Sequence, residues 1–316
     1  MRELIQSTKI NAHVGKNLRA TGYISIPNRN WEPISGLIKL RYGPGWKITT
    51  NRNSYKLDRN QSGGISFIIS TQNPEALLAP LPLYSADYYY NSDMRHVRIT
   101  KELAITRNLD VARAKNPLLA DGKLTERQDV PALNMTNLLG TTPASGSDLS
   151  AKVRILWQPK KLRVLVEVND DVATIAAPNA QLESDVDHVK LFFGPVVSQT
   201  GLSRGSRRYE YLACRTTNGP RVYRLSDPDD ARQHTVTPAG THLGMTHGGG
   251  VTAYEFVFDQ RALEMMDIKP GEALAFNVQV GDDDGPRSPE KFTLLTLAGD
   301  GKMYRTDWPR IVARFK

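Results

Sequence analysis

Residues 151–168 read AKVRILWQPKKLRVLVEV, and this stretch decides the fold class. In its second half, Leu162, Val164 and Val166 alternate with Arg163 and Glu167. A period of two is the pattern of a β-strand that buries one face. The first half, AKVRILW, alternates in the same way, and the QPKK between the halves contains a proline, which favours a turn. The stretch therefore predicts a β-hairpin.

The same alternation recurs through the rest of the C-terminal two-thirds of the chain. We expect further strands at 188–193, 208–215, 221–225, 253–258, 273–280, 292–297 and 310–315. Residues 259–267 differ, because Leu263 and Met266 are spaced for one face of a helix and Asp259 suits an N-cap. We expect this segment to be helical.

The N-terminal third has its own set of candidate strands, at 18–26, 36–41, 65–70, 83–90 and 96–106. Turn signals such as Gly43-Pro44-Gly45 separate them. Many short strands without a long helix predict sandwiches. Residues 107–117 lose the alternation, which favours a linker. The expected fold is all-β, with two antiparallel β-sandwiches in tandem: residues 1–107, a linker at 108–117, and residues 118–316.

Composition narrows the classes of function. The 316 residues carry a formal charge of +8, but Lys and Arg are scattered among acids without a basic helix, so we expect no nucleic-acid partner. No window approaches the ~18 apolar residues of a membrane span, so none is expected, and no signal peptide is visible at the N-terminus. The single cysteine, Cys214, is expected to be a small buried apolar residue.

Five segments, in order, resemble the family-9 carbohydrate-binding modules, a β-sandwich family related to the DOMON domains. They are LADGKL at 119–124, the hairpin at 148–170, DHVKLF at 187–192, YEFVF at 254–258 and FNVQVGDDD at 276–284. The resemblance covers about residues 117–316. It implies a β-sandwich that binds a glycan and is not itself an enzyme.

The first domain is similar to the immunoglobulin-like modules that accompany sugar-binding modules. GLIKL at 36–40, GPGW at 43–46 and the strand at 65–70 carry this similarity. Together the two resemblances imply a non-catalytic accessory part of a polysaccharide-active or cell-surface protein. They also imply a glycan partner (polysaccharide or oligosaccharide), an extracellular or periplasmic location, and covalent attachment to a larger chain.

A sugar site needs flat aromatic faces for the pyranose C–H bonds and polar groups for the hydroxyls. Trp308 lies in a polar stretch before the last expected strand, beside Tyr304 and Arg305. These three residues are the first candidates for carbohydrate binding, and Asp187 and Arg287 complete the set.

The remaining tryptophans are interpreted as structural. Trp157 lies on a patterned strand, where a large apolar side chain belongs to the core. Trp46 and Trp31 belong to the first domain and are expected to be structural there.

Two positions depart from the family. Ser184 stands where members that grip a terminal sugar carry a tryptophan, and Lys190 stands where the family has a glutamate. One aromatic face and one carboxylate are therefore missing from the expected places.

Acidic residues that follow or precede strands are candidates for a structural calcium site. Hard cations take several carboxylate and carbonyl oxygens. The candidate ligands are Asp170, Asp185, Asp282 and Asp284. The alternative is a set of solvated acids, with Arg287 pairing them without metal.

Three other functions stay open. A scaffold would bind protein partners through its sheet edges or loops. A glycoside hydrolase fragment would need two carboxylates about 5–10 Å apart across a cleft. A haem domain of the DOMON type would use Met and His or Lys ligands, but Met245 and His247 are two residues apart and could not easily lie on opposite faces of a haem.

Overall fold

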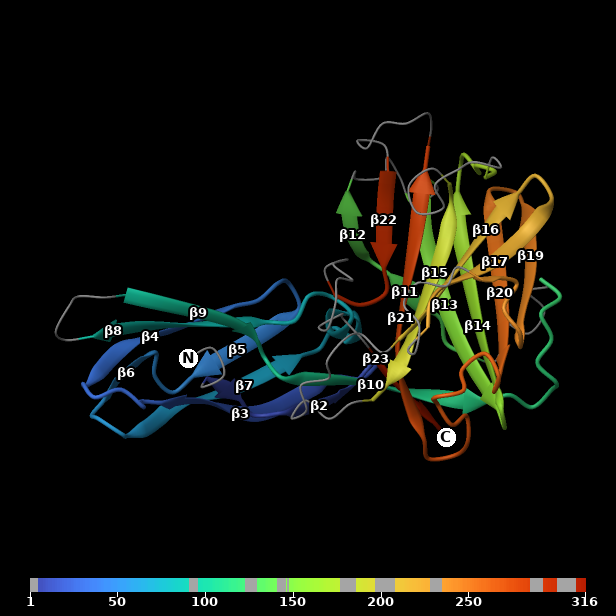
Figure 1. Ribbon diagram of the computed structural model, residues 1–316. Helices are drawn as coiled ribbons and strands as arrows, with labels where there is room; N and C mark the ends of the chain where they lie inside the picture. The colour runs from blue at the N-terminus through green and yellow to red at the C-terminus, as the bar shows by residue number, and fades with distance from the viewer. Residues whose placement is uncertain are drawn as a thin grey trace. The chain divides into compact units, whose positions relative to one another are not determined.

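The computed structural model divides the chain into two compact units, Met1–Asn108 and Leu109–Lys316. It describes residues 5–90, 96–122, 130–140, 146, 148–176, 186–196, 208–227, 235–284, 292–299 and 311–316. Within these ranges every regular element is a strand except one 3-10 turn, η1 (Pro74–Leu77). None of the described residues forms a helix that is long and apolar enough to span a membrane. The all-β prediction is confirmed (Figure 1).

The N-terminal unit contains two four-stranded antiparallel sheets. One has the order β1 (Gln6–Ser7), β3 (Leu18–Pro27), β7 (Ser62–Thr71) and β5 (Trp46–Thr50). The other has the order β6 (Ser54–Leu57), β4 (Ile34–Arg41), β8 (Leu83–Tyr90) and β9 (His96–Glu102). Ile24, Phe67 and Tyr84 are among the buried side chains of its single core. Its resemblance to immunoglobulin-like modules stays a prediction.

The second unit packs two further sheets face to face. The first runs β18 (Thr235–Val236), β17 (Gly219–Ser226), β16 (Tyr209–Thr216), β15 (His188–Pro195) and β21 (Ala273–Asp283). Beyond β21 lie β23 (Ile311–Phe315) and, further along the strand, β22 (Phe292–Thr296) with β12 (Asn137–Gly140). The second sheet runs β11 (Leu133–Met135), β13 (Leu149–Gln158), β14 (Lys161–Asp170), β20 (Val251–Asp259) and β19 (Thr241–Gly248). The prediction of tandem sandwiches is confirmed.

The hairpin that decides the fold class is the one expected. In β13 and β14, Val153 pairs with Val166 and Trp157 pairs with Leu162 in an antiparallel register. The turn between them places Lys160 at a φ of 64°, in the left-handed region that a tight turn requires. The hairpin lies at the centre of its sheet, because β14 also pairs with β20.

Aromatic side chains fill the space between the two sheets of the second unit. The ring of Phe193 on β15 lies 5.0 Å from that of Phe258 on β20 and 5.5 Å from that of Phe276 on β21. Tyr211 on β16 lies 4.9 Å from Phe258. These contacts define the inner face of each sheet, and the side chains one position away point outward.

Trp157 belongs to the core, as predicted. It is fully buried, and its ring centroid lies 5.5 Å from that of Phe315 on the last strand. Its indole Nε1 donates to the carbonyl oxygens of Val111 and Lys316, both at 3.1 Å. A buried indole that satisfies its N–H in this way is a structural residue.

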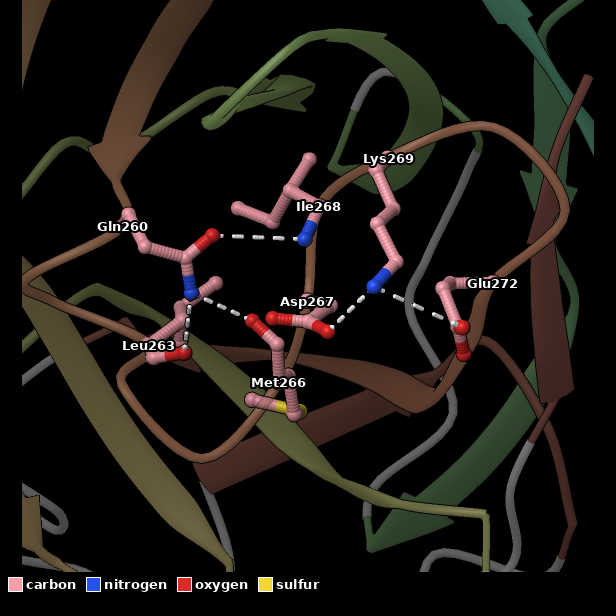
Figure 2. Close-up of polar contacts among 7 residues, drawn as sticks. All are labelled: Gln260, Leu263, Met266, Asp267, Ile268, Lys269 and Glu272. Atoms are coloured by element: carbon pink, nitrogen blue, oxygen red, sulfur yellow. Dashed lines mark hydrogen bonds and ion pairs between the residues drawn. The ribbon is translucent and has the colours of Figure 1, made fainter.

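The predicted helix at 259–267 is wrong. The segment forms turns in which Ala262 N donates to Asp259 O and Met266 N donates to Leu263 O. The side-chain amide of Gln260 donates to the carbonyl oxygens of Leu263 and Met266, at 3.2 and 2.5 Å (Figure 2). Because a side chain satisfies these carbonyls, the backbone closes into turns instead of continuing a helical ladder.

The segment expected as a linker begins within a strand. β10 (Ile105–Arg113) pairs in parallel with β2 (Ile10–His13) through its first four residues and with β13 through Ala112 and Arg113. The boundary between the two units falls after Asn108, inside β10. The expected loop at 108–117 is therefore strand through Arg113.

Candidate functional site

Aspartates collect at one end of the second unit, where strands of both sheets end. Asp170 closes β14, Asp282 lies at the end of β21 and Asp284 follows it. One carboxylate oxygen from each of these three residues lies within 4.8 Å of the other two. A second group, formed by Asp148, Asp171 and Asp284, meets the same distance limit, so Asp284 belongs to both.

We call Asp148, Asp170, Asp171, Asp282 and Asp284 the acidic cluster. Two of its oxygens are buried without a hydrogen-bond partner among the described residues. They are Oδ1 of Asp282, whose residue is 3% exposed, and Oδ1 of Asp284. A buried carboxylate oxygen without a donor loses the free energy of its hydration shell. The cluster therefore has the chemistry of a site that accepts a cation or retains protons.

The pKa values of the cluster reflect this crowding. Burial raises the pKa of Asp282 to about 8, and the negative charges of Asp284, Asp170 and Asp187 add to the shift. Burial likewise raises the pKa of Asp284, again with neighbouring carboxylates. Like charges at short range disfavour ionisation of all of them at once.

Asp187, predicted for carbohydrate binding, lies beside this cluster just before β15. Its Oδ2 accepts a hydrogen bond from Thr174 N at 2.5 Å and its Oδ1 accepts one from Asp283 N at 2.9 Å. Burial raises its pKa to about 7, although these two bonds favour the ionised form. Both oxygens of Asp187 thus engage backbone groups in the described structure.

A second group of charges lies on the outer face of the sheet that contains β15 and β16. Because Phe193 points into the core, Lys190 and Phe192 point outward. Lys190 Nζ lies 3.3 Å from Glu210 Oε2, and Arg208 Nε donates to Glu210 Oε1 at 2.5 Å. The side chains of Lys190, Arg208 and Glu210 are all mostly buried.

Phe192 connects the two cations. Lys190 Nζ lies 5.3 Å from the ring centroid of Phe192, and the guanidinium carbon of Arg208 lies 5.3 Å from the same centroid. Two cations thus lie over a single aromatic ring, and both of them pair with the carboxylate of Glu210. We call Lys190, Phe192, Arg208 and Glu210 the outer-face cluster.

The outer-face cluster bears directly on the departure at Lys190. Lys190, at the position where the family pattern has a glutamate, pairs here with the carboxylate of Glu210 on the neighbouring strand. Reading the sequence alone missed Glu210 and Arg208. The sequence shows the alternation of β16, which indicates the face on which Glu210 lies. It does not show which residue of β15 lies opposite Glu210.

The remaining predicted sugar-binding residues, Trp308, Tyr304, Arg305 and Arg287, lie outside the described residues. The same holds for Asp185 of the predicted metal site and for Ser184.

The interpretation of Trp31 as structural is wrong. Trp31 is 79% exposed, whereas Trp46 is buried as expected. Trp31 lies between β3 and β4, where the chain has no alternation to indicate burial.

Cys214 is buried, as predicted. It packs with Ala176, Val186, Leu212 and Leu225 in an apolar cluster. Burial raises the pKa of its thiol to about 11. Such a thiol behaves as an apolar side chain.

Met245 and His247 both lie on β19, two positions apart and therefore on the same face of that strand. They pair across the sheet with Tyr254 and Thr252, and Nδ1 of His247 lies 2.8 Å from Oγ1 of Thr252. This arrangement directs the two side chains the same way, whereas two axial haem ligands have to approach from opposite sides.

Comparison with known proteins gives one family. The profile described as carbohydrate family 9 binding domain-like matches residues 121–300, more than half of the chain. A solved family 9 carbohydrate-binding module from Caldicellulosiruptor kristjanssonii, in complex with cellotriose, is 16% identical, with a TM-score of 0.45 over 66% of this chain and 93% of that chain. The same organism's module in complex with glucose is 15% identical, with a TM-score of 0.47 over 66% and 95% of the two chains. No curated protein matches the sequence.

Proposed function

The chain belongs to the carbohydrate family 9 binding domain-like family, and from this premise we propose that its second unit binds a glycan without catalysing a reaction. The observation that carries the proposal is the outer-face cluster. It brings a carboxylate and two cations onto one face of the sheet, within the part of the chain that matches the family.

The chemistry of the cluster suits sugar hydroxyls. Glu210 accepts hydrogen bonds, and Lys190 and Arg208 donate them. Together they can therefore pair with a sugar hydroxyl both as a donor and as an acceptor. We propose that Trp308 and Tyr304 supply aromatic surface for the C–H bonds of the ring, and that Arg305, Arg287 and Asp187 contribute polar contacts. The ligand proposed is a polysaccharide or oligosaccharide.

A binding experiment tests this proposal. The full chain is titrated calorimetrically with a panel of neutral oligosaccharides, including cello-oligosaccharides, and is run in native gels that contain neutral polysaccharides. Binding that is lost in Trp308→Ala and weakened in Glu210→Gln supports the proposal. His242→Ala serves as control, because His242 is an exposed residue of the other sheet. Absence of binding to every sugar, or equal loss in the control, contradicts the proposal.

We also propose that the acidic cluster holds a structural Ca²⁺ ion. The residues fit such an ion. Oxygens that lie 2.3–2.6 Å from one Ca²⁺ can be up to about 5.2 Å apart. The carboxylates of Asp170, Asp282 and Asp284 lie within that limit, and two of their oxygens are buried without a donor in the described structure. Asp185, outside the described residues, completes the proposed ligands.

Such an ion would neutralise the carboxylates at the end of the sandwich where β14 and β21 finish. Its role in this proposal is structural: it holds the strand ends together and fixes the loops that follow them. An accessory role within a larger polysaccharide-active or cell-surface protein, in an extracellular or periplasmic location, completes the proposed function.

A further inference from the structure

The net charge of the protein resides entirely in the N-terminal unit. Residues 1–108 contain 15 Lys and Arg and seven Asp and Glu, while residues 109–316 contain 26 of each. The exposed cations of the described N-terminal unit are Lys9, Lys16, Arg19, Arg29, Lys39, Arg41, Lys47, Arg52, Lys56, Arg59 and Arg98. A small unit with this excess of positive charge attracts anionic polymers at long range.

The same unit exposes an indole. Trp31 is 79% exposed, and the guanidinium carbon of Arg59 lies 4.1 Å from its ring centroid. A guanidinium at this distance stacks on one face of the ring. The high exposure of Trp31 shows that the opposite face is open to solvent.

The backbone around Trp31 is held in place by a buried side chain. Asn28 is 1% exposed, and its Nδ2 donates to the carbonyl oxygens of Glu32 and Asp58, both at 2.9 Å. These bonds tie the β3–β4 loop, which carries Trp31, to the β6–β7 loop, which carries Arg59. A loop fixed before binding loses less conformational entropy when a ligand arrives.

We name residues 28–33 and 58–61 the Trp31 tip. It lies at one end of the unit, since Pro27 pairs with Ser62 and Ile34 pairs with Leu57 immediately before and after the loops. The tip presents Arg29, Arg59 and the open face of Trp31, together with the acids Glu32 and Asp58. Aromatic surface and guanidinium groups therefore stand side by side at one exposed edge.

We propose that the Trp31 tip binds an acidic polysaccharide whose sugars carry carboxylates. The C–H face of a pyranose ring covers the open face of the indole, and the sugar carboxylate pairs with Arg59 and Arg29. The remaining positive charge of the unit speeds encounter with the anionic chain. A sugar is favoured over other polyanions because the same chain carries the second unit, and this point rests on the function proposed above.

The test uses the full chain in native gels that contain polygalacturonate, with its fully methyl-esterified form as a neutral polymer of the same backbone. Polygalacturonate should retard the protein, and added salt should weaken the retardation. Trp31→Ala and Arg59→Gln should each weaken the association constant about fivefold, the ratio expected for one aromatic contact or one charge pair. Lys16→Gln is the matched control: it also removes one exposed positive charge, but at the opposite end of β3.

Three outcomes would overturn the proposal: equal retardation by the methyl ester, equal retardation by single-stranded DNA, or a loss in Lys16→Gln as large as in Arg59→Gln. Equal retardation by the methyl ester would show that the sugar carboxylate is not recognised, and equal retardation by single-stranded DNA would show that a sugar is not required. An equal loss in Lys16→Gln would show that binding is not specific to the Trp31 tip. Glu210→Gln separates this inference from the proposed function of the second unit. Retardation by polygalacturonate that persists in Glu210→Gln and falls in Trp31→Ala assigns binding to the tip, even if neutral sugars do not bind at all.

Discussion

Lys190 and Glu210 lie on adjacent antiparallel strands of one sheet, with Lys190 Nζ 3.3 Å from Glu210 Oε2. Each side chain is 13% exposed, so the pair is largely removed from water. Arg208 approaches the same carboxylate, which makes Glu210 the acceptor for two cations. The geometry predicts that Glu210 matters more for stability than either cation alone.

Replacing Glu210 by Gln keeps the shape of the side chain and removes its charge. Lys190 and Arg208 then lose a charged acceptor in a mostly buried position, and the free energy of unfolding should fall by about 1–3 kcal/mol. Urea unfolding followed by tryptophan fluorescence measures this change. Adding Lys190→Met should recover part of the loss, because it removes one of the two cations that face the neutral side chain at position 210. Simple additivity of the two substitutions would contradict the coupling.

Two tryptophans form a matched pair for a second test of stability. Trp157→Ala removes a buried indole and two hydrogen bonds, so the free energy of unfolding should fall by about 3–5 kcal/mol. Trp31→Ala removes an indole that is 79% exposed and should change the same quantity by less than about 0.5 kcal/mol. Chemical denaturation of each single variant measures both values. Similar losses in the two variants would contradict the burial that distinguishes them.

Calcium removal provides a third test. Treatment with a chelator should lower the Tm of the full chain, and Ca²⁺ added in excess should restore it, because the proposed ion would bind the folded acidic cluster and not the unfolded chain. In Asp282→Asn the Tm should no longer depend on Ca²⁺, since a ligand charge is lost. Asp267→Asn is the matched control, because this aspartate is exposed and lies in the 259–272 turn region, paired with Lys269. If the Tm of the unmodified protein does not change with Ca²⁺, the metal is ruled out, and the acidic cluster is a set of protonated and solvated acids.

The thiol of Cys214 should be inert in the native protein. Its pKa is raised to about 11 by burial, so at pH 8 almost none of it is the thiolate that reacts with alkylating reagents. Because burial raises the pKa, the thiolate forms only as the pH rises toward about 11, and the rate of alkylation should increase over the same range. Labelling with iodoacetamide at pH 8, followed by mass spectrometry, should be complete in denaturant and negligible without it. Rapid labelling of the folded protein would show that the apolar cluster around Cys214 opens readily.

The sequence by itself determined the fold class and the position of the central hairpin. Alternation in residues 151–168 has a direct physical cause, because successive side chains of a strand point to opposite faces and one face must be apolar to be buried. The same reasoning identified Trp157 as a buried residue, and Cys214 was expected to be buried because a solitary cysteine behaves as a small apolar side chain. Where the reasoning used helical spacing instead, at 259–267, it failed, because the Gln260 side chain satisfies the carbonyls that a helix would have used.

Only the tertiary structure decided which charges meet. Glu210 meets Lys190 because β15 and β16 are adjacent strands of one sheet, whereas Asp282 meets Asp170 because strands of two different sheets end close together. Alternation within one strand carries no information about either kind of neighbour. The exposure of Trp31 also depended on the fold, because a residue between strands has no periodic pattern that places it inside or outside. Local pattern follows from the geometry of a single strand, whereas the assembly of a site depends on how strands are paired, and that pairing is set by the packing of the whole unit.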